Sequence, residues 1–149
     1  MSDTVLITGI SGWIAQYCAV ELLKNGFYVR GSLRDKNREQ EVRNTLSSWM
    51  SFSEQLSFCK LDLLSDDGWD DAMKGCKYVL HIASPFVIAE PKNENELIKP
   101  AKEGTLRALR SAQKAGVKRV VLTSSIASMS AHMKKGTFSD QSWTDLKSK

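Results

Sequence analysis

Short apolar runs alternate along the chain with longer stretches in which apolar residues recur at helical spacing. The runs are rich in valine, isoleucine and leucine and occupy residues 5–7, 27–33, 56–59, 78–82 and 120–122. Three of them are nearly unbroken, which is typical of parallel strands that are covered on both faces. We therefore predict that each run is a buried strand.

The segments between the first three runs predict two helices. Ile14, Cys18 and Leu22 follow one another at intervals of four residues and would line the buried face of a first helix, which Gly26 would end. A second amphipathic stripe predicts another helix and consists of Val42, Leu46, Trp49 and Met50.

Two more helices are predicted in the second half. A short one is indicated by Ser65 as N-cap, Trp69, Met73 and a terminating Gly75. A longer one is expected over about 94–115, ending at Gly116, and Pro100 would kink it or mark the start of its main segment. Its buried side is expected to carry Ile98, Ala101, Thr105, Leu109 and Ala112.

Five strands alternating with four helices predict an α/β fold, a doubly wound and mostly parallel five-stranded Rossmann sheet with helices on both faces. No repeat and no linker-like tract divides the chain, so residues 1–149 are expected to form a single domain. The polar segment 134–149 shows neither period and is expected to be a loop-like tail. Folds of this kind normally continue, so we expect the chain to stop before a sixth strand.

Composition narrows the class of protein. The 149 residues are 42% hydrophobic and 26% charged, which fits one soluble globular domain with a sizeable core. The net charge of +4 comes from basic residues spread along the chain, so no nucleic-acid partner is expected. No apolar run approaches the length of roughly eighteen residues that a membrane helix needs, so no membrane partner is expected either.

The cysteines and histidines point away from disulfides and metals. Cys18, Cys59 and Cys76 match neither a CxxC pair nor a disulfide framework, which indicates a reducing, cytoplasmic compartment. With so scattered a cysteine set, His81 and His132 cannot complete a zinc site, and no metal is expected.

The first strand leads directly into a glycine-containing turn and then into the first helix. Residues without a Cβ let backbone N–H groups approach a pyrophosphate, and a helix N-terminus favours the anion. The candidate cofactor-binding residues here are Thr8, Gly9, Ser11, Gly12, Trp13 and Ile14. The spacing G-x-x-G-x-x-A, which ends at Ala15, differs from G-x-G-x-x-G, so a purely structural turn stays the alternative.

The end of the second strand bears on the choice of cofactor. NAD-binding domains place an acidic residue about 20 positions after the glycines, whereas an arginine there accommodates a 2′-phosphate. Arg34 ends the strand, with Lys36 and Arg38 close behind, and this favours NADP. Because Asp35 follows Arg34, NAD stays an alternative cofactor. The alternative without a cofactor role is that these basic residues merely form a solvated turn.

Several motifs in order are more specific than any one of them. They are the turn from Thr8 to Ala15, Arg34-Asp35, Asp62-Leu63, His81-Ile82-Ala83-Ser84-Pro85, Gly116-Val117-Lys118-Arg119 and Val121-Leu122-Thr123-Ser124-Ser125. Together they resemble the extended short-chain dehydrogenase/reductases, and within them the branch of dihydroflavonol reductases and cinnamoyl-CoA reductases. The resemblance covers essentially the whole chain and implies an NAD(P)-binding Rossmann domain.

The resemblance also implies roles for residues after the later strands. Asp62 and Leu63 would flank the adenine, with the carboxylate accepting from its amine, while the structural alternative is that Asp62 caps a turn. The other residues expected to line the cofactor cleft are Ala83, Ser84, Pro85 and Thr123.

By the same resemblance, Ser125 is the catalytic serine that binds the substrate carbonyl, and Ser124 is the alternative if the register differs by one residue. His81 is expected to be a packed strand histidine and not a catalyst, because nothing near it in sequence orients it. Glu103 is a departure, since many relatives have asparagine there.

The family's proton donor is a tyrosine followed four residues later by a lysine. Tyr17, Tyr28 and Tyr78 are followed instead by Glu21, Ser32 and Ile82, so the chain contains no such pair. In relatives the pair lies a few dozen residues after the serine, and the segment 138–146 resembles the approach to it.

These features predict the NADP(H)-binding portion of a carbonyl reductase, an oxidoreductase that transfers hydride between NADPH and an aldehyde, ketone or thioester. Without the tyrosine and lysine, the chain alone is expected to turn over very poorly. The alternatives are a natural non-catalytic dinucleotide-binding module, acting as a redox sensor or partner subunit, and a structural remnant. The resemblance also implies a homodimer through the helix near 94–115.

Overall fold

A five-stranded parallel sheet forms the centre of the structure, a computed structural model that describes residues 3–52, 54–85, 92–130 and 135–145. The strands are β1 (Thr4–Thr8), β2 (Tyr28–Leu33), β3 (Leu56–Lys60), β4 (Cys76–His81) and β5 (Arg119–Leu122). Their order is β3-β2-β1-β4-β5, and every neighbouring pair is parallel. The predicted doubly wound fold is therefore confirmed, with the reversal of strand order between β1 and β4.

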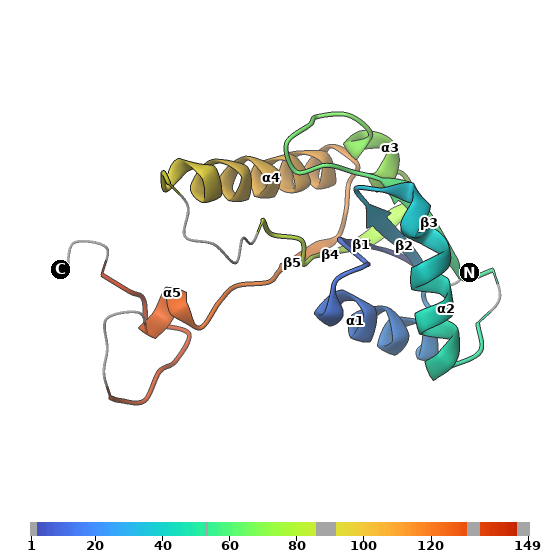
Figure 1. The fold of residues 1–149 in the computed structure, drawn as a ribbon, viewed down its shortest axis with the longest axis horizontal. Helices are drawn as coiled ribbons and strands as arrows, with labels where there is room; N and C mark the ends of the chain where they lie inside the picture. Colours follow the sequence, from blue (N-terminus) through green and yellow to red (C-terminus); the bar gives the residue numbers. More distant parts are fainter. Residues whose placement is uncertain (1–2, 53, 86–91, 131–134, 146–149) are drawn as a thin grey trace.

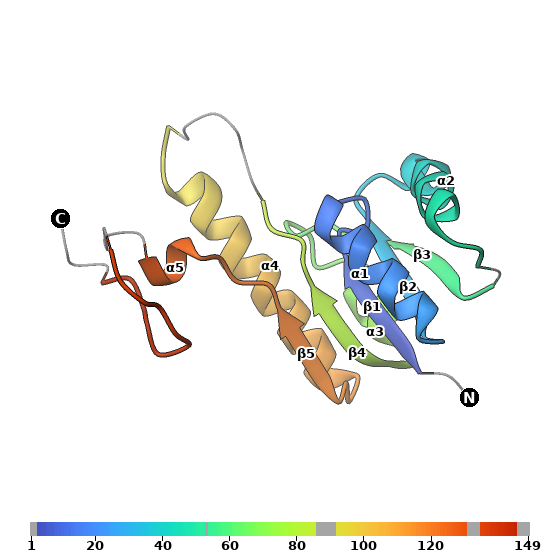
Figure 2. The same cartoon turned by 90° about the horizontal axis from the view of Figure 1, so that it is seen from below.

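Helices cover both faces of the sheet (Figures 1 and 2). They are α1 (Trp13–Lys24), α2 (Glu39–Trp49), α3 (Trp69–Met73) and α4 (Asn95–Lys114), with a 3₁₀ turn at Lys36–Arg38. A further short helix, α5 (Ala127–Ser130), lies away from the sheet. One core, around Ile7 and Leu46, lies between the sheet and α1 and α2. The other, around Leu6 and Trp69, lies between the sheet and α3 and α4.

The buried face of α1 lies one position away from the predicted one. Its buried residues are Ala15, Ala19, Val20 and Leu23. Ile14, expected in the core, is 52% exposed, and Cys18 and Leu22 are only partly buried. The prediction was wrong because it weighed hydrophobicity and not volume: alanine methyl groups let the helix backbone lie close to the strands.

Small residues also form the buried side of α4, which consists of Gly104, Ala108, Ser111 and Ala112. A Cβ on Gly104 would lie 2.8 Å from Leu63 Cδ2, so this glycine lets the loop after β3 pack on the helix. Ile98 and Leu109, predicted on the buried side, are 52% and 42% exposed. The helix continues through Pro100, which therefore does not mark its start.

The N-cap of α3 is Gly68 and not Ser65, so that prediction was wrong. Gly68 has a φ of 78°, a left-handed conformation that favours glycine. The Ser65 hydroxyl accepts instead from the N–H of Asp67 (3.1 Å), while its carbonyl accepts from Trp69 Nε1 (3.0 Å). The loop is thus shaped around the buried indole of Trp69.

The chain after β5 leaves the sheet (Figure 1). A short helix that the sequence did not predict, α5, follows the strand, and residues 135–145 form turns and irregular segments. Thr144 binds this stretch to α5: its N–H donates to the Ser128 carbonyl (2.8 Å) and its hydroxyl to the Ala127 carbonyl (2.9 Å). His132 and residues 134 and 146–149 lie outside the described residues.

Gly31 in β2 generates a test of this packing. A Cβ at Gly31 would lie 2.6 Å from Ile10 Cγ2 and 2.8 Å from Ile10 Cβ, so the fully buried Ile10 fills the space of the missing side chain. Gly31→Ala should therefore lower the free energy of unfolding by about 1–3 kcal/mol in urea denaturation, as overpacking does. In an Ile10→Ala background the same change should cost much less, and an equal cost in both backgrounds would contradict this packing.

Candidate functional site

The segments that follow the strands meet at one edge of the sheet, because the carboxyl ends of parallel strands all point the same way. The segments that carry the predicted site residues are 9–14, 34–36, 62–63, 83–85 and 123–125. In open α/β sheets, ligands bind beyond the carboxyl ends of the strands, at the point where strand order reverses. Here that point lies between β1 and β4, directly beside the glycine turn.

The glycine turn is fixed to the end of β2. Gly9 has a φ of 68°, and its N–H donates to the Ser32 hydroxyl (3.0 Å). The Ile10 N–H donates to the Ser32 carbonyl (3.0 Å), and the Gly12 N–H closes the turn on the Gly9 carbonyl (2.9 Å). Both polar groups of Ser32 thus hold the turn in place.

Close approach to the next strand is what requires glycine at position 9. A Cβ there would lie 2.9 Å from Ala83 Cβ, which is too close for two carbon atoms. Gly12 then caps α1 without a side-chain hydrogen bond, so the first N–H groups of the helix have no partner within it. A compact turn followed by unpaired helix N–H groups is suited to an anion such as a pyrophosphate.

Beside the turn, the ends of β1 and β4 are joined by the hydroxyl of Thr8. It accepts from the N–H groups of Ile82 and Ala83, at 3.0 Å each, and lies 3.0 Å from His81 Nδ1. Thr8 is fully buried, so this predicted cofactor-binding side chain is wholly engaged with the protein. His81 is buried too, as expected, with its ring edge-to-face against Trp69.

The basic segment after β2 contains both free and neutralised charges. Arg38 donates to Glu41 through Nε (2.8 Å) and Nη2 (2.6 Å), and this pairing raises the pKa of Arg38 and lowers that of Glu41. Asp35 is also engaged, because its carboxylate accepts from the Asn37 N–H (3.0 Å). Among the described residues, the exposed Arg34 and Lys36 form no ion pair, so they are the available cations.

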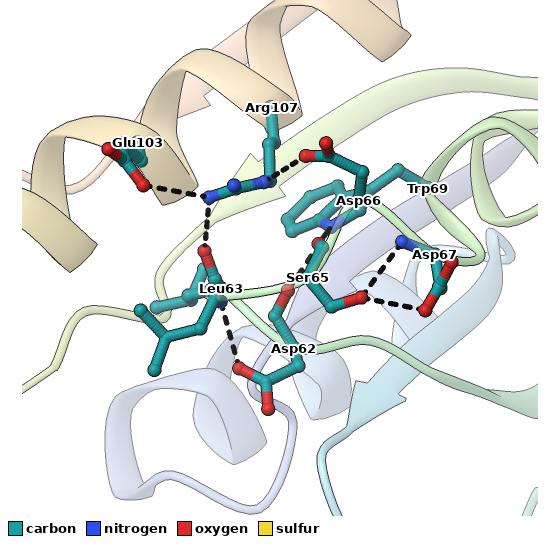
Figure 3. A network of polar contacts seen from close by, with 9 residues as sticks. Asp62, Leu63, Ser65, Asp66, Asp67, Trp69, Glu103 and Arg107 are labelled. Atoms are coloured by element: carbon teal, nitrogen blue, oxygen red, sulfur yellow. Dashed lines mark hydrogen bonds and ion pairs between the residues drawn. The ribbon is translucent and has the colours of Figure 1, made fainter.

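The loop after β3 is held by its own polar contacts (Figure 3). Asp62 Oδ1 accepts from the Leu64 N–H (2.9 Å), so the carboxylate caps a turn, and no described residue binds its other oxygen. The Leu63 carbonyl accepts from Arg107 Nη1 (2.7 Å), and Arg107 also pairs with Asp66 and, at 3.7 Å, with Glu103. Arg107 therefore holds α4 against this loop, whereas Glu103, the departure from the family pattern, contacts Arg107 within the helix.

The predicted site residues after β4 and β5 have fewer contacts with the glycine turn. Ala83 lies against the glycine turn, Ser84 is exposed and Pro85 is half-buried. The Thr123 N–H extends the sheet by donating to the His81 carbonyl (3.0 Å). Both candidate serines are exposed, and each contacts α5. Ser125 Oγ accepts from the Ala127 N–H (3.3 Å), and Ser124 Oγ lies 3.2 Å from Ser128 Oγ.

The structure therefore brings Thr8, Gly9 and Ala83 into one cluster and leaves Arg34, Asp62 and Ser125 on the separate segments that follow β2, β3 and β5. The sequence analysis missed Ser32, which positions the turn. The sequence offered one indication of this role: Ser32 is a polar residue near the end of a predicted buried strand, and in a parallel sheet that end lies close to the glycine turn.

A hollow of about 590 Å³ lies elsewhere, along α4. Its lining comes from α4, including Asn95, Lys99, Lys102 and Arg110, with Asp66 of the loop after β3 as the exception. Since the predicted site residues converge at the carboxyl edge of the sheet, the geometry there carries more functional weight than the volume of this hollow.

The part of the chain that the structure describes contains neither a candidate membrane helix nor a candidate metal cluster. No helix there has the length and apolarity to cross a membrane, and no group of three or more potential ligand side chains gathers as a metal site would require. Cys18, Cys59 and Cys76 are free, and burial raises the pKa of the Cys59 thiol to about 11. Cys59 therefore stays protonated near neutral pH.

His81 generates a pH-dependent prediction. Burial lowers its pKa below the ordinary 6.5, so the folded state favours the neutral ring. Above about pH 6.5 the neutral His81 ring makes its full contribution to the free energy of unfolding. As the pH falls below this value, His81 of the unfolded chain takes up a proton before His81 of the folded chain does, and stability is lost. The loss amounts to at most about 1.4 kcal/mol per pH unit and stops once the pH is below the lowered pKa of the folded state. In denaturation between about pH 7.5 and pH 5, wild type should lose more stability than His81→Asn. Identical pH profiles of the two proteins would refute this.

Comparisons of sequence find relatives among known reductases. The model of the NAD dependent epimerase/dehydratase family matches residues 5–146. Dihydroflavonol 4-reductase of Zea mays is 34% identical over 145 residues, which are 96% of this chain and 40% of the relative. Tetraketide alpha-pyrone reductase 1 of Arabidopsis thaliana is 40% identical over 122 residues, 81% of this chain and 37% of the relative. The chain thus corresponds to the N-terminal portion of these relatives and spans about 40% of their length.

Comparisons of structure agree. The yeast methylglyoxal/isovaleraldehyde reductase Gre2, complexed with NADPH, has a TM-score of 0.80 and 31% identity, covering 94% of this chain and 43% of the reductase. Gre2 from Candida albicans in its NADPH complex has a TM-score of 0.82 and 26% identity, covering 97% of this chain and 44% of that protein. The resemblance inferred from the motifs is confirmed, and the chain belongs to the NAD dependent epimerase/dehydratase family.

Proposed function

We propose that this chain binds NADPH across the turn between β1 and α1, and that it is the cofactor-binding portion of a carbonyl reductase. The observation that carries the proposal is the Gly9 turn, whose backbone approaches Ala83 so closely that a Cβ would have no room. Such a turn lets the backbone N–H groups of Ser11 and Trp13 face a pyrophosphate at the N-terminus of α1, while the Gly12 N–H closes the turn on the Gly9 carbonyl.

Arg34 supports NADPH over NADH. It is exposed at the end of β2 and unpaired among the described residues, whereas Asp35 caps a turn and Arg38 is neutralised by Glu41. A free guanidinium matches a 2′-phosphate, which NADPH carries and NADH lacks. The NADPH complexes of the two related reductases agree with this choice.

When bound, NADPH would supply the hydride for reduction of an aldehyde, ketone or thioester. In our proposal the unbound oxygen of Asp62 accepts from the adenine amine, and the Ser125 hydroxyl binds the substrate carbonyl. The chain carries no tyrosine followed four residues later by lysine. A general acid contributes about 10²–10⁴-fold, so we expect these 149 residues to bind cofactor without appreciable turnover.

The second candidate is a non-catalytic dinucleotide-binding module that acts as a redox sensor or partner subunit. It would use the same turn and the same arginine, because a fold and its cofactor site do not fix an activity. A reading frame that continues into Tyr-x-x-x-Lys beyond Lys149 would establish the reductase, and a stop codon directly after Lys149 would favour the module.

The cysteines support a reducing compartment, and we propose the cytoplasm. All three are free thiols, and burial keeps the pKa of Cys59 at about 11, far from the range of a reactive thiolate.

Binding can be measured by thermal shift with NADPH and NADH. Ligand at 100 times its Kd stabilises the folded state by about 2.7 kcal/mol, which raises the Tm of a domain of this size by roughly 5–10 °C. Arg34→Ala should weaken NADPH about tenfold or more and leave NADH nearly unchanged, since only NADPH carries the 2′-phosphate. The matched control is Arg110→Ala, an exposed arginine of α4 that should change neither.

Gly9→Ala should abolish the response to both nucleotides in the same assay. No shift with either nucleotide in wild type would overturn the proposed function. Equal weakening by Arg34→Ala and Arg110→Ala would show that the basic end of β2 has no specific role.

A homodimer through α4 is the partner that we propose. Ile98 and Leu109 expose apolar surface on this helix, and apolar surface that is left open favours association. Light scattering at increasing concentration should show dimers that Leu109→Lys weakens, while Tyr28→Lys, at an exposed position on β2, should have no effect. A monomer at every concentration would contradict the proposal.

A further inference from the structure

Thr8 and His81 are paired residues of neighbouring strands, at the point where the strand order reverses. The Thr8 hydroxyl has two lone pairs and one hydrogen atom. Both lone pairs are used by the N–H groups of Ile82 and Ala83, so the hydrogen atom is left for His81 Nδ1, 3.0 Å away. His81 Nδ1 must therefore be the acceptor, and the neutral ring carries its proton on Nε2.

This bond decides the orientation of the hydroxyl. If Nδ1 carried a proton, three donors would compete for two lone pairs, and one of the backbone N–H groups would lose its partner. Burial of His81 favours the neutral ring, in agreement with this assignment.

The position of Ala83 follows from the same hydroxyl. Its backbone N–H is bound by Thr8, and its Cβ lies where a side chain on Gly9 would otherwise be. The width of the gap between the glycine turn and the chain after β4 therefore depends on a chain of contacts from His81 through Thr8 to Ala83.

The His81 ring is itself held in place. Trp69 contacts it edge-to-face with ring centroids 6.3 Å apart, and the indole is fixed because Nε1 donates to the carbonyls of Asp62 (3.2 Å) and Ser65 (3.0 Å). Rotation of His81 away from Thr8 would have to displace this buried indole.

We propose that His81 is a positioning residue for the cofactor site: its Nδ1 orients the Thr8 hydroxyl, which holds the backbone of Ala83 at the distance from Gly9 that a dinucleotide needs. This inference rests on the proposed function and assigns His81 no contact with the cofactor.

Paired substitutions at position 81 test the role of Nδ1. In His81→Asn the amide oxygen takes the place of Nδ1 as an acceptor, whereas His81→Leu has no acceptor. NADPH binding by the 149-residue chain, measured by calorimetry near neutral pH, should be close to wild type for His81→Asn and about tenfold weaker for His81→Leu. Thr8→Ser should bind like wild type, and Thr8→Val should lose about as much as His81→Leu.

Two NMR measurements on wild type and His81→Asn keep the inference testable if the other variants do not fold. In wild type, long-range ¹H–¹⁵N spectra should show the proton of His81 on Nε2. In both wild type and His81→Asn, the Ile82 and Ala83 amides should be protected from hydrogen exchange. A proton on Nδ1, or affinity in a folded His81→Leu equal to wild type, overturns the inference alone. If wild type itself fails to bind NADPH, the proposed function is overturned, and the inference with it.

Discussion

The structure depends on how closely β1 and β4 approach each other at their carboxyl ends. Parallel pairing places Thr8 beside His81, and Gly9 and Ala83, just beyond the ends of the two strands, must then share a space that holds one side chain only. Ala83 fills it with a methyl group and Gly9 supplies none. The glycine turn follows from this constraint, and so does the exposure of the first N–H groups of α1 at the site.

Small residues also set the distance between the sheet and one helix on each of its faces. Ala15 and Ala19 bring α1 close to the strands, and Gly104 and Ala108 do the same for α4. Ile14 of α1 and Leu109 of α4, by contrast, are largely exposed. The helices are therefore close enough to the sheet for short connections such as the Gly9 turn to join a strand directly to a helix.

The sequence was sufficient for the architecture, because periods of apolar residues specify strands and helices directly. It was insufficient for the faces of α1 and α4, where alanine and glycine outweigh the more hydrophobic Ile14 and Leu109, since packing distance is not encoded in hydrophobicity. The glycine turn and Arg34 could be located from local motifs. The parts played by Ser32 and Thr8 depend on contacts across strands, which no linear pattern contains.

The central claim is that a dinucleotide lies at the carboxyl edge of the sheet, and the most direct test is an amide ¹H–¹⁵N map of the labelled chain during addition of NADPH. If a dinucleotide binds there, the largest changes are expected for Ser11, Gly12, Trp13 and Arg34, because these residues would surround the pyrophosphate and the 2′-phosphate. Changes confined to the hollow along α4, around Lys99 and Lys102, would contradict it. So would a spectrum that NADPH leaves unchanged.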